Sequence, residues 1–448
     1  MQQERQTAVT GLIVFALIGA IASIALPGKS SKQANQGMEE QVLAMNTSGA
    51  SAKPVRLGKV PKLKQGRPIA PKFLKVITPP DLDLNNSNPT WSLDGNYLGY
   101  EKHDQKDKEL VITDSKGNVV QTVAYKAEGD DLGLSLLLPG IADQGRYNAG
   151  LTWSLPFTPQ PDPVELEKAK KELAEGKIQT MPPAPVPVHR FIYMSNGSEG
   201  NYDLYLGNVG SEENVRLTDH PEKDGHAHWS PKNDQVLFVS GRSGKADIYL
   251  FDIASKETRK MTNGVKSFLY PQWSPDGTKA VMIYGSNENH DIYIMDDFSK
   301  EPKKNVRPLN NWSYDDLRPM WSPDGEKIAF YTNYNVGNDP KEWALVVLEI
   351  EKFNEEPLYD LTPYIVATDV IPDIEKGPAW MPDSKNLIYV KKDREKYNPI
   401  HVVDYKDRVD RMVQTDTRIN HDLSASKDGT IAFRSQVETW DQIFLVKF

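Results

Sequence analysis

Apolar runs and polar turns alternate along most of this chain with a regular spacing. A tryptophan, the turn sequence Ser-Pro-Asp-Gly and an apolar run form one unit, as in "WSPDGEKIAFY" at residues 321–331, and similar stretches begin at Trp91, Trp229 and Trp273. Proline fixes its own φ, aspartate bonds back to the local backbone and glycine accepts positive φ, so the tetrapeptide favours a tight turn between two strands. A third strand, marked by "DLY" or "DIY", and a fourth near "LT" complete each unit. Four strands per unit of roughly 45 residues predict the blades of a β-propeller, an all-β fold.

The number of units predicts seven blades. The unit markers are Trp91, Trp153, Trp229, Trp273, Trp321, Trp380 and Ala425, which replaces tryptophan in the last unit. We interpret the six tryptophans as structural wedges between neighbouring blades. The last unit ends after three strands, and "FLKVIT" at residues 73–78 is a candidate for its fourth strand. Because this pairing removes two exposed sheet edges, we expect the ring to close in this way. Six blades are the alternative, if the long second unit does not form a blade of its own.

The order W-S-P-D-G, apolar strand, D-I-Y, L-T resembles the repeat of the TolB-like propeller family over residues 73–448. The resemblance implies a β-propeller domain, which we place at residues 72–448. TolB itself resembles a six-bladed periplasmic propeller with an extra N-terminal domain that engages envelope partners. This chain differs in having seven units and a polar tether where that domain would lie.

The second unit contains an insertion. It has 32 residues more than the other units, and the surplus maps to residues 157–188. Asp162 is placed as an N-cap, Pro163 as the first helical residue and Gly176 as a stop, which predicts a helix. The proline-rich "MPPAPVPV" that follows predicts an extended return arm. The insertion is either a docking element or a surface loop. A shorter surplus, "TPYIVATDVIPDIEKGP", lies in the fifth unit at residues 362–378.

The N-terminus predicts a membrane anchor. Residues 8–26, "AVTGLIVFALIGAIASIAL", carry no charge, and a helix of this length spans roughly 28 Å, close to the hydrocarbon thickness of a bilayer. A cleaved signal peptide is the alternative, because Ala20-Ile21-Ala22 and Ser23-Ile24-Ala25 resemble small-residue cleavage sites. We assign residues 1–26 to an anchor or signal segment. Residues 27–71, rich in Gly, Ser, Ala, Asn, Lys and Pro, predict a basic flexible linker.

Charge separates this linker from the rest of the chain. The formal net charge is −9, and residues 27–80 carry ten Lys or Arg but only Glu39 and Glu40. Since Glu4 and Arg5 cancel, residues 81–448 hold −17. Such a body lacks the clustered basic surface that phosphate binding needs, so nucleic acid is not expected as a partner. The absence of cysteine excludes disulfides, thiolate chemistry and cysteine-ligated metals.

The candidate binding residues lie on the incoming strands, near the expected central tunnel. They are His226, His228, Tyr270, Arg318 and His421, and the positions equivalent to His226 in other units also hold Asn88, Gly377 and Asp422. His226 and His228 are two apart on a strand, so their side chains should point the same way. Some relatives, the oligogalacturonate lyases, resemble seven-bladed propellers that hold a divalent metal with tunnel histidines, and only His421 is available here as a third imidazole. No nucleophile elbow, P-loop or dinucleotide motif occurs. We therefore predict no catalytic residue, no metal and no cofactor.

These patterns favour a non-catalytic propeller that is tethered to the bacterial inner membrane through residues 8–26, lies in the periplasm and binds protein partners in a cell-envelope complex. If the N-terminal segment is cleaved, the protein would instead be secreted to the periplasm. The alternative function is a tunnel-based carbohydrate-active enzyme, similar to the metal-dependent oligogalacturonate lyases, or a glycan-binding propeller.

Overall fold

The computed structural model describes the part of the chain that follows the predicted anchor. It covers residue 60 and residues 62–78, 84–104, 107–124, 147–197, 201–232, 234–286, 289–299, 302, 305–310, 314–334, 342–352, 356–358, 360–393 and 397–448. The predicted anchor at residues 8–26 and most of the predicted linker lie outside these residues. In the part of the chain that is described, no helix is long and apolar enough to cross a membrane.

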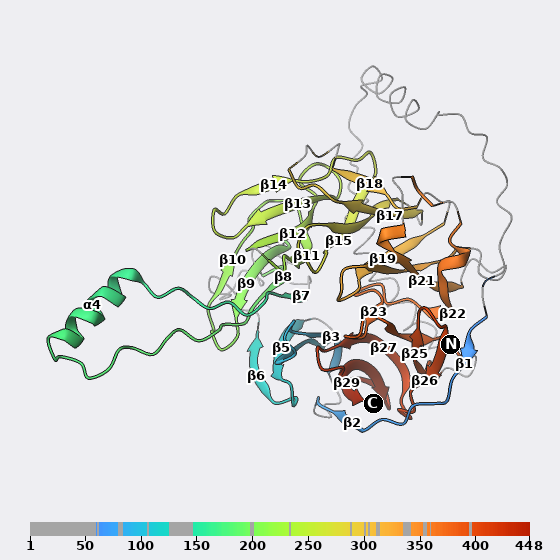
Figure 1. Cartoon of the computed structure of the whole chain (residues 1–448), viewed down its shortest axis with the longest axis horizontal. Helices are drawn as coiled ribbons and strands as arrows, with labels where there is room; N and C mark the ends of the chain where they lie inside the picture. Colours follow the sequence, from blue (N-terminus) through green and yellow to red (C-terminus); the bar gives the residue numbers. More distant parts are fainter. Residues whose placement is uncertain are drawn as a thin grey trace, which may run out of the picture.

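Four-stranded antiparallel units, which we call blades, follow one another around a central axis (Figure 1). Blades one and two contain β3 (Asn85–Trp91), β4 (Tyr97–His103), β5 (Lys108–Asp114), β6 (Val119–Val123), β7 (Asn148–Trp153), β8 (Arg190–Ser195), β9 (Asp203–Asn208) and β10 (Asn214–Arg216). Blades three and four contain β11 (Asp224–Trp229), β12 (Gln235–Ser240), β13 (Asp247–Asp252), β14 (Thr258–Lys260), β15 (Ser267–Trp273), β16 (Ala280–Gly285), β17 (His290–Met295) and β18 (Val306–Pro308). Each of these four blades is a separate sheet whose first strand lies nearest the axis.

Blades five and six share one sheet. They contain β19 (Asp316–Trp321), β20 (Lys327–Thr332), β21 (Trp343–Glu349), β22 (Ile365–Ile371), β23 (Ala379–Trp380), β24 (Asn386–Lys391), β25 (Ile400–Asp404) and β26 (Val409–Met412). The two blades are joined because β22 pairs with both β21 and β24. Two short 3-10 helices, Ile350–Lys352 and Thr362–Tyr364, precede β22. The surplus at residues 362–378 therefore supplies the outer strand of blade five and its link to blade six.

Blade seven is completed by the N-terminal strand, as the sequence predicts. It contains β27 (Arg418–Ala425), β28 (Ile431–Val437), β29 (Trp440–Lys447) and β2 (Phe73–Val76). β2 pairs antiparallel with β29 from Phe73–Lys447 to Val76–Phe444, and Ile77 donates its backbone N–H to the carbonyl of Ile443 at 3.0 Å. The second strand of the described residues and the last one thus lie in one sheet, and these residues form seven four-stranded blades.

The end of the predicted linker is bound to the ring. β1 (Lys64–Gln65) pairs in parallel with β26, and Ile69 donates its backbone N–H to the carbonyl of Met412 at 2.8 Å. Leu63 packs on the apolar cluster of blades five and six, and Ile69 on that of blades six and seven. Residues 62–71 therefore belong to the folded ring and not to a flexible linker. Their apolar residues are too widely spaced to form a pattern in the sequence, because each one fills a separate seam between blades.

The turn chemistry expected from the repeat is present in the structure. The serine hydroxyl donates to the aspartate at 2.8 Å in the pair Ser92–Asp94 and at 2.5 Å in the pair Ser274–Asp276. The glycine that follows has positive φ, for example 77° at Gly95. Each of these turns is therefore closed by its own residues, and this explains why the tetrapeptide marks the turn between the first two strands of a blade.

The marker tryptophan of each of the first six blades packs against the blade before it. Trp91 lies in one cluster with Leu445 of blade seven, and Trp153 in one cluster with Ile112 of blade one. Three indole N–H groups also donate to a backbone carbonyl of the preceding blade: Trp153 to Thr90 at 3.0 Å, Trp321 to Gln272 at 3.2 Å and Trp380 to Met320 at 3.3 Å. All six tryptophans are buried. This is the arrangement that structural wedges require.

Candidate functional site

A set of backbone irregularities surrounds the axis of the ring. In each blade the third residue before the tryptophan position has a positive φ of 48° to 89°, on the inner strand or, in blade six, just before it; these residues are Asn88, Gly150, His226, Tyr270, Arg318, Gly377 and Asp422. The pairing register shifts at this residue in six inner strands. Positive φ costs about 1–2 kcal/mol for most side chains, so its recurrence shows a bulge built into the repeat. A bulge changes the direction of a side chain, and here it does so once per blade beside the axis.

Three of the candidate residues form a stack across blades three, four and five. The Arg318 guanidinium carbon lies 4.1 Å from the centre of the Tyr270 ring, and the His226 ring meets Tyr270 edge-on with centroids 4.5 Å apart. Burial, together with the positive charge of Arg318, lowers the pKa of His226 to about 3 and that of His228 to about 4. Both histidines are therefore neutral at neutral pH. The Nδ1 atom of His228 accepts a hydrogen bond from the backbone N–H of Trp273 at 3.2 Å.

The other side of the axis holds charged residues from blades six, seven and one. Arg434 forms ion pairs of 2.8 Å with both Asp422 and Asp441, and Asp422 also accepts the backbone N–H of Asn88 at 3.2 Å. Burial, followed by the charge of Arg434, lowers the pKa of His421. The structure thus places His421 in this charged group, away from the stack that contains His226.

The turn at residues 373–376 contributes charged groups that the sequence did not identify. It belongs to the connection between blades five and six, yet Lys376 donates a hydrogen bond to the backbone carbonyl of Pro89 in blade one. Burial lowers the pKa of Lys376 to about 8 and, together with nearby Asp422, raises that of Asp373 to about 6. The turn also packs closely on blade five at Gly377, where a Cβ atom would lie 2.8 Å from the backbone oxygen of Arg318. The surplus length at residues 362–378 was the available signal for this turn.

The histidines do not assemble into a metal site. Considering only the residues that the structure describes, no group of three or more His, Cys, Asp or Glu side chains could hold a metal ion. One ring nitrogen of His228 is already occupied by the Trp273 backbone. The residues present therefore do not fit the divalent metal that the oligogalacturonate lyase resemblance implied.

Arg318 is a largely buried cation at the axis. It is only 8% exposed, and its Nε atom is buried without a hydrogen-bond partner. Within the described ranges its guanidinium makes no hydrogen bond or ion pair; it lies over the face of Tyr270, and it attracts the carboxylates of Glu375 and Asp373. An anion that reached the axis would therefore compete with these two carboxylates for the guanidinium.

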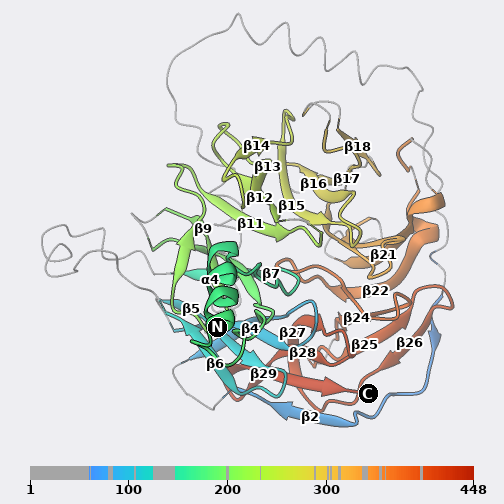
Figure 2. The same cartoon turned by 60° about the vertical axis from the view of Figure 1, so that its left-hand side comes forward.

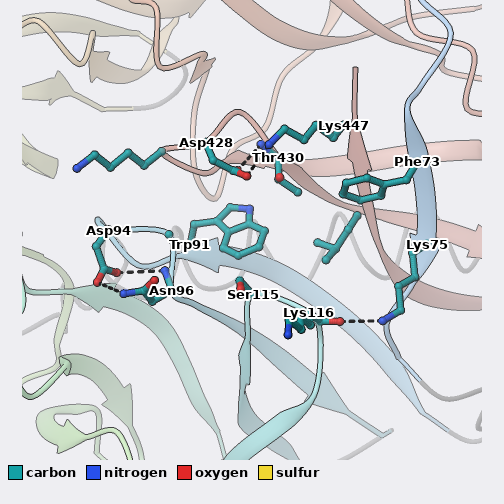
Figure 3. Close-up of a pocket in the computed structure, with 13 residues that line it drawn as sticks. Phe73, Lys75, Trp91, Asp94, Asn96, Ser115, Lys116, Asp428, Thr430 and Lys447 are labelled. Carbon is teal, nitrogen blue, oxygen red and sulfur yellow. Dashed lines mark hydrogen bonds and ion pairs between the residues drawn. The ribbon is translucent and has the colours of Figure 1, made fainter.

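A separate pocket lies where the ring closes, and we call it the closure pocket (Figure 3). Its volume is about 610 Å³. β2 and β29 of blade seven form one wall, and turns of blade one form the other; the lining residues include Phe73, Lys75, Trp91, Asp94, Lys116 and Asp428. Lys75 Nζ bridges the walls by donating to the backbone carbonyl of Lys116 at 2.7 Å. The pocket therefore depends on closure through the N-terminal strand.

The insertion in blade two projects away from the ring (Figures 1 and 2). It carries α4 (Pro163–Ala174), and the side chain of Asp162 accepts the backbone N–H of Val164 at 2.8 Å as the expected N-cap. Its base is closed by backbone hydrogen bonds of 2.9 and 2.7 Å between Phe157 and Val188. We call residues 157–188 the arm. The base ties the arm back onto itself, so the helix stands outside the blade that carries it.

Comparison with known proteins supports the class of fold. The family model described as the TolB beta propeller domain matches residues 164–340, and the predicted resemblance to this family is confirmed. Two solved structures share the fold over most of the chain, and both are only distantly related in sequence. An oligogalacturonate lyase in complex with manganese has 11% identity and a TM-score of 0.54, covering 86% of this chain and 96% of that one.

The oligogalacturonate lyase from Vibrio parahaemolyticus has 12% identity and a TM-score of 0.54, with 88% of this chain and 98% of that one covered. TolB from Acinetobacter baumannii has 14% identity and a TM-score of 0.45, with 74% and 67% covered. A sequence search of curated proteins gives no significant match. The chain is similar to the TolB beta propeller domain by its family match and to the two lyases by its fold, and identities this low show the fold alone.

Proposed function

We propose that this protein is a non-catalytic propeller of the bacterial cell envelope that binds protein partners, held at the inner membrane by residues 8–26 with the propeller in the periplasm. Seven blades around one axis give a stiff platform from which connecting segments can contact other molecules. The feature that carries the proposal is the arm.

The arm has the properties of a docking element. It extends well beyond the blades in Figure 1, it is closed at its base, and its helix has its own N-cap. Val164 at the start of α4 is 75% exposed, and Val186 in the proline-rich segment that leads back to the blade is 73% exposed. Apolar side chains held so far from the core do not stabilise the ring, and they are available to a partner.

The axis supports a non-catalytic function. Its charged groups largely bind one another or the backbone, as Arg434 does with Asp422 and Lys376 with Pro89. The neutral histidines contact blade four, His226 through Tyr270 and His228 through the Trp273 backbone. None of these contacts combines a nucleophile, a base and an orienting group, which acyl or proton transfer would need.

The arm can be tested by replacement. Tagged full-length protein and a variant whose residues 157–188 are replaced by a short Gly-Ser loop would be used to capture partners from membranes. We expect the variant to keep its β-rich circular dichroism and to lose specific partners, because loop length enters closure entropy only logarithmically. An unchanged set of partners would contradict the proposal.

A matched pair of substitutions sharpens this test. Val164→Ser changes an exposed valine on the arm, whereas Val265→Ser changes a valine that is 71% exposed in the connection between blades three and four. We expect only Val164→Ser to weaken capture. Equal effects of both changes would show that the partner does not recognise the arm.

A second candidate function is the binding of an acidic sugar at the axis, and the observation that favours it is the Arg318 guanidinium, which makes no hydrogen bond or ion pair within the described residues. A uronate carboxylate could accept two parallel hydrogen bonds from it. Isothermal titration with an oligogalacturonate in metal-free buffer would test this, with a neutral oligosaccharide as control. Binding that is abolished by Arg318→Met would favour the glycan function, and the absence of heat with either sugar would exclude it.

A further inference from the structure

The closure pocket has cationic groups that are not used within the protein. In the described part of the chain, the ammonium groups of Lys116 and Lys427 have no hydrogen-bond or ion-pair partner. The pocket's carboxylates, by contrast, are engaged: Asp94 with His189 at 2.6 Å and Asp428 with Lys447 at 2.6 Å. The charge that remains available in the pocket is therefore positive.

The pocket also offers apolar surface. Trp91 and Leu445 are buried at its base, and Phe73 on β2 is 43% exposed beside them. In Figure 3 the Trp91 ring lies between Thr430 and Ser115, with Phe73 at one end of the pocket. The Trp91 indole nitrogen is buried without a hydrogen-bond partner. An apolar base next to unused donors is suited to an amphipathic ligand.

From this combination we propose that the closure pocket docks an acidic peptide segment of a partner protein. One large apolar side chain of the segment would rest on Trp91 and Phe73, and flanking carboxylates would pair with Lys116 and Lys427. A volume of about 610 Å³ accommodates such a side chain with its neighbours. Residues 81–448 carry a net charge of −17, so a cationic pocket in this acidic body attracts an acidic segment to one place on its surface.

The position of the pocket couples docking to closure of the ring. One wall comes from the N-terminal strand paired with β29, and the other from blade one. A Cβ atom on Gly117 would lie 2.5 Å from the side chain of Ile77, so the end of the N-terminal strand and the turn that carries Lys116 are in close contact. A segment bound between these walls contacts the first and last blades together, and binding should therefore stabilise the closed ring.

The proposal rests on the function as an interaction platform but uses a surface separate from the arm. The test uses the full chain and a fluorescein-labelled peptide, Asp-Glu-Leu-Phe-Glu-Asp, followed by fluorescence anisotropy at low ionic strength. We expect saturable binding that weakens at least tenfold in the double variant Lys116→Glu, Lys427→Glu. Lys256→Glu is the control variant. Lys256 is an exposed lysine between the third and fourth strands of blade three, as Lys116 is in blade one. This variant should change peptide binding less than twofold.

Two peptide controls separate docking from general attraction. A peptide with serine in place of leucine and phenylalanine should bind at least tenfold more weakly, and a peptide with lysine in place of the acids should not bind. Equal binding of the serine peptide, or equal loss in the Lys256→Glu variant, would reduce the pocket to a general cationic patch and overturn the proposal. Removal of the arm should leave peptide binding unchanged, so failure of the arm experiment and failure of this one are distinguishable.

Discussion

Trp321 and Trp273 offer a direct test of how the blades are held together. Both are buried wedges at equivalent repeat positions, but their polar atoms differ. The Trp321 indole donates to the Gln272 carbonyl at 3.2 Å, whereas the Trp273 indole nitrogen is buried without a partner. Replacing each one by phenylalanine keeps an aromatic ring in the seam and removes only the indole N–H and some volume. At position 273 the new ring can still stack on Phe298, whose ring centroid lies 4.4 Å from that of Trp273.

The expected costs follow from this difference. Trp321→Phe loses a hydrogen bond with a net value of about 0.5–1.5 kcal/mol, and it leaves the Gln272 carbonyl to be satisfied in another way. Trp273→Phe removes a donor whose burial without a partner already costs about 1–3 kcal/mol, so part of the lost packing is offset. We therefore expect Trp321→Phe to destabilise the protein by about 1.5–4.5 kcal/mol more than Trp273→Phe. Truncation to alanine should cost about 3–5 kcal/mol at either site.

Urea unfolding followed by circular dichroism is the assay, and it requires that the m-value stay constant between the variants so that midpoints can be compared. Equal costs for the two phenylalanine variants, or a larger cost for Trp273→Phe, would refute the role given to the indole hydrogen bond. If Trp321→Ala or Trp273→Ala kept full stability but lost partner binding, the assignment of that tryptophan as a structural wedge would be wrong.

Three further predictions concern closure, buried charge and pH. Deletion of residues 1–59 should leave the melting temperature unchanged, and deletion of residues 1–71 should lower it modestly by removing β1. Deletion of residues 1–78 should lower it most, because it opens blade seven. Equal melting temperatures for all three truncated proteins would contradict closure. Arg434→Met should cost about 3–5 kcal/mol because it leaves Asp422 buried without its partner, whereas Arg318→Met should be nearly neutral; thermal unfolding of both variants would reveal a reversed order. The pKa of His226 is lowered to about 3 in the folded protein, so the unfolded chain takes up the proton first as pH falls below about 6.5. This histidine therefore destabilises the fold progressively between about pH 6.5 and 3 and has no effect on stability above about pH 6.5. His226→Gln should therefore lose less stability than the wild type between pH 7 and 4, measured by urea unfolding at each pH, and an identical pH profile would show that His226 is not kept neutral by burial.

The repeat determined most of the fold because its information is local. A turn such as Ser274 to Gly277 is closed by its own hydroxyl, carboxylate and glycine, so its sequence alone specifies it. The strand that follows is specified by its apolar run. The closure by residues 73–78 was predictable for a related reason, since a unit with three strands leaves a sheet edge that another strand must cover. The helix in the arm was equally local, with its cap at Asp162.

The axis and the closure pocket were decided by contacts between residues far apart in the chain. The sequence aligned Tyr270 and Arg318 at equivalent positions, but only the ring brings one onto the face of the other. Lys376 binds Pro89 although 287 residues separate them, and no repeat pattern encodes such a contact because it depends on which blades meet across the axis. The binding of residues 62–71 to β26, the outer strand of blade six, and the pocket between the first and last blades arise for the same reason. Local residue preferences determine the blades and their order along the chain. The way in which the blades close into a ring determines which charged side chains from distant parts of the chain come close to one another.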